Sequence, residues 1–225
     1  MTMTLPIPRN RDNHVRLSIL VAIDPTQSSA KDWGHQLAEF EATLISVLEN
    51  RPSDAEILVC HDGSYEDPFD LCAEGVRFCV PTESADEPSL IDLWQAGLAE
   101  ASGRHIHLIG GGAKVTAGWS DSAQLAFESD RCGIVAGHCS TDLEQPNEEV
   151  LAGIMPGSGG GLRFADVAES RLAMPLLQGS FWRRELLVSV LEQLETTNEA
   201  SLSLVASQLA VDAGWKIRFV NDCSI

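Results

Sequence analysis

The sequence predicts an α/β fold with a mainly parallel central sheet and helices on both of its faces. Short runs of almost continuous apolar residues, such as residues 17–23 (LSILVAI), are typical of strands that are buried on both sides. Between such runs, apolar residues recur at three- and four-residue steps, as at Leu37, Phe40 and Leu44, which indicates one face of a helix. Regular alternation of strand and helix favours crossover connections between parallel strands.

Each element can be placed on the chain by its pattern and its end signals. The expected strands are residues 17–23, 56–60, 76–80, 105–109, 133–136 and, at an edge of the sheet, 215–220. The expected helices are residues 37–48, 88–103, 119–127, 183–194 and 200–213. Pro88 suits a first helical turn, whereas Gly103 and Gly214 suit helix ends. Residues 140–161 are acidic, then rich in Gly and Pro, and we expect them to form a mobile surface loop.

Length and charge narrow the class of protein. The 225 residues suffice for one large α/β domain, and 15 Lys and Arg against 33 Asp and Glu give a net charge of −18. Such a charge repels polyanions, so we expect no nucleic-acid partner. No apolar run of membrane-spanning length occurs, and the six cysteines form no C-x-x-C pair. We therefore expect a cytoplasmic protein with reduced thiols and no transmembrane segment.

Four segments form a recognisable pattern: residues 46–64 (SVLENRPSDAEILVCHDGS), 97–103 (GLAEASG), 179–185 (GSFWRRE) and 214–217 (GWKI). Together they resemble the family 2 glycosyltransferases, which have the GT-A fold of nucleotide-diphospho-sugar transferases. The resemblance implies a single GT-A domain over residues 1–225. Residues from about 15 to 110 would form its nucleotide-binding half, and residues from about 111 to 225 its acceptor half. It also implies transfer of a sugar from a UDP- or GDP-linked donor.

Asp62 is the first candidate site residue. It comes directly after an expected strand, and open parallel sheets bind ligands beyond the carboxyl ends of their strands. By resemblance, Asp62 matches the aspartate that accepts a hydrogen bond from the nucleotide base, while Gly63 and Ser64 complete the turn. From the residues alone, Asp62 is equally suited to an Asx turn with its own backbone.

Three glycines stand where the family has the Asp-x-Asp motif that holds a divalent metal. Residues 110–112 read Gly-Gly-Gly, and glycine has no side-chain oxygen for Mg²⁺ or Mn²⁺. We therefore expect neither a metal site nor another cofactor. The backbone amides of Gly111 and Gly112, helped by Lys114, would still suit a diphosphate. The alternative is a flexible turn, since no G-x-G-x-x-G or P-loop pattern is present.

The catalytic base is the second departure from the family pattern. The family has a Glu-Asp pair before its late helix, and the matching positions lie near Ser201 and Leu202, so Glu199 is the remaining candidate. A missing base typically lowers the rate by about two to four orders of magnitude. The alternative is therefore an inactive homologue that acts as a binding or assembly protein, with a protein partner or as a homo-oligomer. A nucleotidyltransferase is disfavoured because its glycine-rich N-terminal phosphate loop is absent.

The remaining polar candidates have ordinary explanations beside the functional ones. His105 and His107 alternate on one strand face, which suits two metal ligands but also two satisfied strand histidines. His61 precedes Asp62 and invites an acid-base pair, although no nucleophile follows from the sequence. Arg183 and Arg184 suit either a phosphate or acceptor carboxylate, or surface salt bridges. Asp24 and Pro25 stand where the family often has residues that stack on the base.

Overall fold

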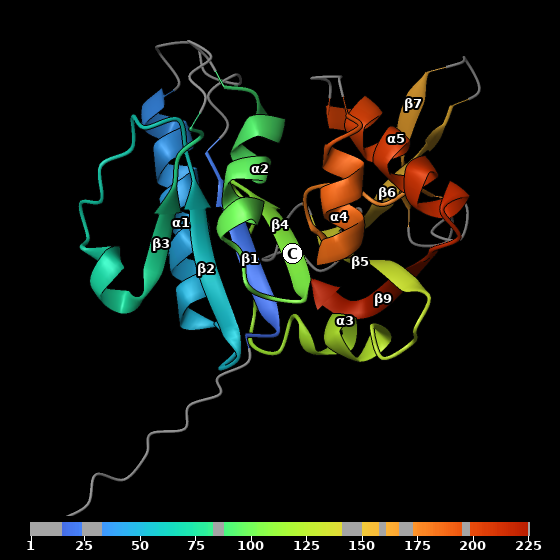
Figure 1. Cartoon of the computed structure of the whole chain (residues 1–225), viewed down its shortest axis with the longest axis horizontal. Helices are drawn as coiled ribbons and strands as arrows, with labels where there is room; N and C mark the ends of the chain where they lie inside the picture. Colours follow the sequence, from blue (N-terminus) through green and yellow to red (C-terminus); the bar gives the residue numbers. More distant parts are fainter. Residues whose placement is uncertain are drawn as a thin grey trace, which may run out of the picture.

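A computed structural model of the chain describes residues 15–23, 33–82, 88–140, 150–157, 161–166, 173–194 and 199–224 (Figure 1). The strands are β1 Leu17–Ala22, β2 Ala55–Cys60, β3 Val76–Cys79, β4 His105–Gly110, β5 Cys132–Ser140, β6 Val150–Pro156, β7 Leu162–Asp166, β8 Ser180–Arg183 and β9 Lys216–Ser224. The helices are α1 Trp33–Glu49, α2 Leu90–Glu100, α3 Asp121–Ala126, α4 Arg184–Leu191 and α5 Glu199–Asp212. A short 3₁₀ helix, η2 Leu71–Glu74, precedes β3.

Seven strands form the central sheet in the order β3-β2-β1-β4-β8-β5-β9. All of them run parallel except β8, which is antiparallel to both of its neighbours. Beyond this sheet, the end of β5 continues into an antiparallel ladder with β6 and β7. The predicted α/β class with a mostly parallel sheet is therefore confirmed.

Helices cover both faces of the sheet, as the apolar patterns predict. On one face, α2, α4 and α5 pack around Trp94, Trp182 and Leu202, which are all fully buried. On the other face, α1 and α3 pack around Phe40, Trp119 and neighbouring strand residues. Among the described residues, no helix has both the length and the apolar character needed to cross a membrane.

Helix α2 approaches the sheet closely because of its glycine. A Cβ on Gly97 would overlap the Cys60 sulfur and lie 3.0 Å from a Leu20 methyl group. The start of the helix is fixed by a capping box, in which Ser89 and Asp92 each bond the other's backbone N–H. Because β3 runs parallel to β2 and α2 is the next element, the helix starts at the end of the sheet where β1, β2 and β4 finish.

The sequence-based prediction was wrong between β5 and α4. Residues 140–161 are not a structureless loop, because β5 extends to Ser140 and β6 occupies Val150–Pro156 within that range. Strand β7 was not predicted, and β8 occupies residues just before and at the expected start of the helix 183–194. Strand β9 borders only β5 among the described strands, as expected of an edge strand.

Candidate functional site

The carboxyl ends of β1, β2 and β4 lie side by side at one edge of the sheet, which we call the carboxyl rim. Ala22 of β1 is paired with Cys60 of β2 on one side and with Gly110 of β4 on the other. The ladder continues past these ends, since Ile23 donates its N–H to the Cys60 oxygen at 3.0 Å. The Asp62 turn (residues 61–64) and the bend formed by Gly110, Gly111 and Gly112, which we call the glycine bend, thus begin two strand spacings apart, about 10 Å.

Asp62 forms the Asx turn that its position in the sequence suggests. Its Oδ1 accepts the Ser64 backbone N–H at 2.9 Å and the Ser64 hydroxyl at 2.6 Å. Burial alone would raise the pKa of Asp62, but the bonds from Ser64 outweigh it, so the pKa is lowered. Gly63 has a φ of +100°, a conformation that favours glycine. The second carboxylate oxygen is not used by this turn.

A cluster of aromatic rings packs beside the Asp62 turn and supports it. The sequence patterns did not predict this cluster. The Tyr65 ring stacks on Phe78 at 5.9 Å and meets Phe40 edge-on at 5.3 Å. His61 packs against the same rings, and its Nδ1 accepts the Gly63 N–H at 3.1 Å. Burial lowers the pKa of His61, with the nearby Asp62 charge offsetting only part of the shift. His61 is therefore neutral and positions the turn.

The glycine bend turns toward α1 on leaving β4. The Gly112 N–H lies 3.4 Å from the Glu39 carbonyl oxygen of α1 and donates to it, and Gly111 lies against the backbone of Phe40. Gly112 has a φ of +92°. The Gly112 amide, which we expected to bind a diphosphate, therefore donates to a protein carbonyl instead. The Gly111 amide makes no such bond to the described backbone.

Lys114 follows this path away from the carboxyl rim. Its neighbour Val115 accepts a bond from Asn50 at 3.1 Å and donates its N–H to Ser46 Oγ at 3.3 Å. Asn50 follows the last residue of α1, and that end of the helix leads back to the start of β2. Lys114 is exposed beside this end of α1, so the structure does not bring it to Asp62.

Gln178 lies at the carboxyl rim beside Gly110, a residue that the sequence analysis missed. The Gly179 N–H donates to Leu108 at 2.7 Å, which extends the β4–β8 ladder toward the rim. A Cβ on Gly110 would overlap the Gln178 amide oxygen and lie 2.9 Å from its Cδ. The space next to Gly110 that a side chain would need is thus filled by the Gln178 amide.

The start of α5 reaches the same neighbourhood. Ser203, in the first turns of the helix, accepts the Leu177 N–H at 2.8 Å, directly next to Gln178. Glu199 is the first residue of α5, but its side chain lies outside the described residues, as do Asp24 and Pro25. The helix that contains the candidate base therefore begins near Gly110 and Gln178.

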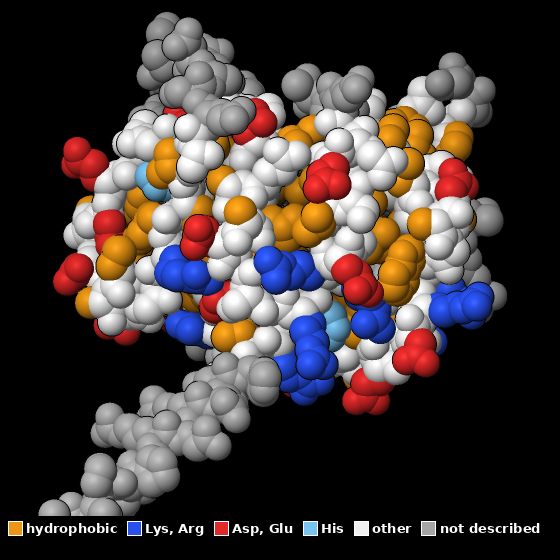
Figure 2. All heavy atoms as spheres, in the orientation of Figure 1, with side chains coloured by type: hydrophobic (Ala, Val, Ile, Leu, Met, Phe, Trp, Pro, Cys, Tyr) orange, Lys and Arg blue, Asp and Glu red, His pale blue; other side chains and the backbone are white. Residues whose placement is uncertain are grey.

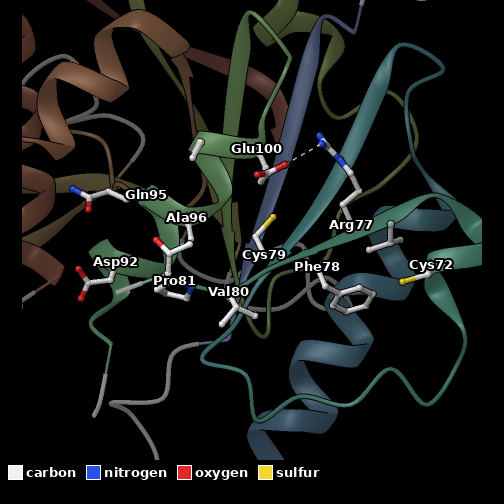
Figure 3. A pocket seen from close by; sticks show the side chains of 13 residues that line it. Cys72, Arg77, Phe78, Cys79, Val80, Pro81, Asp92, Gln95, Ala96 and Glu100 are labelled. Atoms are coloured by element: carbon white, nitrogen blue, oxygen red, sulfur yellow. Dashed lines mark ion pairs between the residues drawn. The ribbon is translucent and has the colours of Figure 1, made fainter. Parts of the chain in front are cut away.

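A groove of about 760 Å³ adjoins the rim on its outer side (Figure 3). It lies between β3 and α2, and its lining includes Val80, Pro81, Asp92, Gln95 and Glu100. Figure 3 shows Arg77 and Glu100 facing each other across it as an ion pair, at 3.8 Å. A Cβ on Gly63 would lie 3.8 Å from a Val80 methyl group, so the groove reaches the Asp62 turn.

The opposite, amino end of the sheet holds arginines in structural roles. Arg183 donates from Nε and Nη2 to the carbonyl oxygens of Cys132, Phe127 and Ser129 at 2.7 to 3.0 Å, so most of its donors stabilise the fold. A shallow pocket of about 530 Å³ at this end includes Arg104 and Arg184. Figure 2 shows Lys and Arg side chains gathered across the lower half of the face in view.

The two strand histidines do not form a metal pair. His105 Nδ1 lies 3.1 Å from Gln124 Oε1, and its ring stacks on Phe127 at 4.2 Å. His107 is fully buried between Trp119 and Phe181. Among the residues that the structure describes, no three His, Cys, Asp or Glu side chains are grouped to hold a metal ion.

The sheet and the helices on both faces define a glycosyltransferase-like α/β fold. The structures that this chain resembles include S. aureus TarS residues 1–349, with a TM-score of 0.59 at 12% identity over 92% of the chain. The complex of the same TarS fragment with UDP-GlcNAc and the structure of TarS itself both give 0.57 at 13% identity, again over 92%.

Similarity at this level of identity establishes the fold alone. The chain spans 58%, 56% and 35% of the three TarS structures, in the order given. Comparison with protein-family models finds no match, and neither does comparison with curated proteins.

Proposed function

We propose that this chain is a divergent family 2 glycosyltransferase-like protein that binds a UDP- or GDP-linked sugar at the carboxyl rim. The observation that supports this most directly is the pairing of Ala22 with both Cys60 and Gly110. It aligns the ends of β2 and β4 at one edge, where parallel sheets bind ligands. A TarS structure of similar fold is a complex with UDP-GlcNAc.

In this proposal, Asp62 binds the nucleotide base through the carboxylate oxygen that its Asx turn leaves free. Gly63 and Ser64 fix the turn, so the carboxylate is already oriented before the ligand binds. The groove between β3 and α2 extends the site beside the base, because Val80 lines the groove and lies beside Gly63. Gly111 supports the diphosphate by its backbone amide, and Glu199 is the base for an acceptor hydroxyl.

Titration calorimetry with UDP and GDP, with and without Mn²⁺, tests the binding. Asp62→Ala should weaken UDP by about 10- to 100-fold, the range for a hydrogen bond that involves a charged group. Asp130→Ala is the matched control, since Asp130 is exposed and lies two residues before the start of β5, at the other end of the sheet. No binding of either nucleotide under any condition would refute the proposal.

An inactive homologue is the second candidate, favoured by glycine at 110–112 and by the occupied space beside Gly110. Release of UDP from UDP-GlcNAc separates the two functions. Turnover that Asp62→Ala removes supports the enzyme. Nucleotide binding without turnover, together with nucleotide-independent association with another protein or a second copy, supports the binding or assembly protein.

A further inference from the structure

The family to which the sequence is similar holds its donor diphosphate through a divalent metal, and the residues at the carboxyl rim do not suit that metal. Gly110 has no side-chain ligand atom, and a carboxylate placed there would collide with Gln178. The described residues also contain no group of three side chains suited to a metal ion. Mg²⁺ at a diphosphate normally needs at least one protein carboxylate.

Gln178 is placed to contact the diphosphate in place of a metal ion. It lies beside the last residue of β4, held by the bond from Gly179 to Leu108. Its Oε1 faces the space beside Gly110, and its Nε2 lies 3.6 Å from the position that a Gly110 Cβ would take. The residue is half-buried, and its amide forms no hydrogen bond with another described residue. An amide nitrogen offers two N–H donors.

We infer that Gln178 replaces the metal at this site, so that its amide N–H groups bind the diphosphate of the donor and no divalent cation is needed. A phosphate oxygen is a charged acceptor, and hydrogen bonds to it are about twice as strong as neutral ones. The inference deepens the proposed function and rests on it. Gly110 is required because any side chain there would displace the Gln178 amide.

Calorimetry with UDP as the probe tests this, in EDTA and again in Mn²⁺. We expect the wild-type Kd to agree within about twofold between the two conditions, because no step of binding uses the cation. Gln178→Ala should raise the Kd in EDTA by about 10-fold or more, as for one lost bond to a charged group. Gln208→Ala is the matched control, because Gln208 is exposed and bonds Asp212 near the other end of α5.

Gln178→Glu gives a second, opposite readout at nearly constant size. Its carboxylate should repel the diphosphate in EDTA and weaken UDP more than alanine does, while Mn²⁺ should restore affinity by bridging the two anions. Circular dichroism and urea unfolding verify that each variant is folded. A Kd in Mn²⁺ at least tenfold below that in EDTA for the wild type would overturn the inference, and so would unchanged UDP affinity in folded Gln178→Ala. Either result leaves the proposed function standing, whereas no UDP binding by the wild type refutes both.

Discussion

Replacing His107 with leucine should make the protein less sensitive to acid. The His107 ring is fully buried, 3.9 Å from the Phe181 ring and 4.8 Å from the Trp119 ring by centroid. No hydrogen bond of ordinary geometry reaches either of its nitrogens. Burial lowers the pKa of His107 to about 3, and the backbone near Ser180 offsets only a small part of that. The folded state therefore holds this imidazole neutral.

The size of this effect on the free energy of unfolding follows from the difference in bound protons between the unfolded and folded chains. Between pH 6.5 and about 3, the unfolded chain binds a proton at this histidine and the folded chain does not. The free energy of unfolding then falls by up to about 1.4 kcal/mol for each pH unit below 6.5. From pH 7.5 to pH 5, His107 should cost the wild type roughly 2 kcal/mol. The leucine side chain is similar in volume and does not titrate, so it should change the stability at pH 7.5 by less than about 1.5 kcal/mol.

Urea unfolding followed by tryptophan fluorescence at several pH values between 4.5 and 8 measures the effect. The stability of His107→Leu relative to wild type should rise by roughly 2 kcal/mol as the pH falls from 7.5 to 5. His35→Leu is the matched control, because the His35 side chain is 76% exposed and its removal should leave the pH dependence of the wild type in place. Parallel stability curves for His107→Leu and wild type would refute this account of the buried ring.

Three further substitutions test how the sheet is held. Glu56→Gln should lower the free energy of unfolding by about 1–3 kcal/mol at pH 7, since the carboxylate accepts the Ser102 N–H at 2.6 Å. Burial alone would raise the pKa of Glu56, but the hydrogen bonds outweigh burial and lower it. The loss measured by urea unfolding should therefore shrink below pH 4.5, where the wild-type carboxylate becomes protonated. Arg183→Lys should lower stability by about 2–4 kcal/mol in urea, because lysine cannot reach three carbonyls at once, whereas Arg184→Lys should change it by under 1 kcal/mol. Gly97→Ala should lower the melting temperature through overlap with the Cys60 sulfur, a cost of about 1–3 kcal/mol, and a rise would show that α2 has room to move.

The sequence predicts the parallel half of the fold well because those strands are buried on both faces. Strands β1, β2 and β4 have nearly continuous apolar runs, and the turn after each one is marked by polar or glycine residues. The antiparallel half gives weaker signals. Gly153 in β6 has a φ of +148° and lies where a Cβ would meet the Met174 carbonyl, so the glycine that resembles a loop signal is required by close backbone approach. Arg183 ends β8 and stands at the N-cap position of α4, so the helical spacing that begins there obscures the short strand before it.

The candidate site shows the same division between local and distant causes. The Asx turn of Asp62 could be predicted because it depends on residues two positions apart. The position of Lys114 could not, since it depends on the bond between Val115 and Ser46 of α1. Gln178 also could not be found from the sequence, because only the pairing of β4 with β8 brings it to Gly110.

The two ends of the sheet differ in how their polar groups are used, and this difference favours the carboxyl rim as the ligand site. At the amino end, Nε and Nη2 of Arg183 donate to three backbone oxygens, and Glu56 is bonded by Ser18, Ser102 and Arg77. Groups committed in this way stabilise the fold and are poorly suited to bind a ligand. At the carboxyl rim, the Asx turn uses only one Asp62 oxygen, and the Gln178 amide forms no hydrogen bond with another described residue. Polar groups held by the backbone with unused capacity are what a binding site for a nucleotide sugar requires.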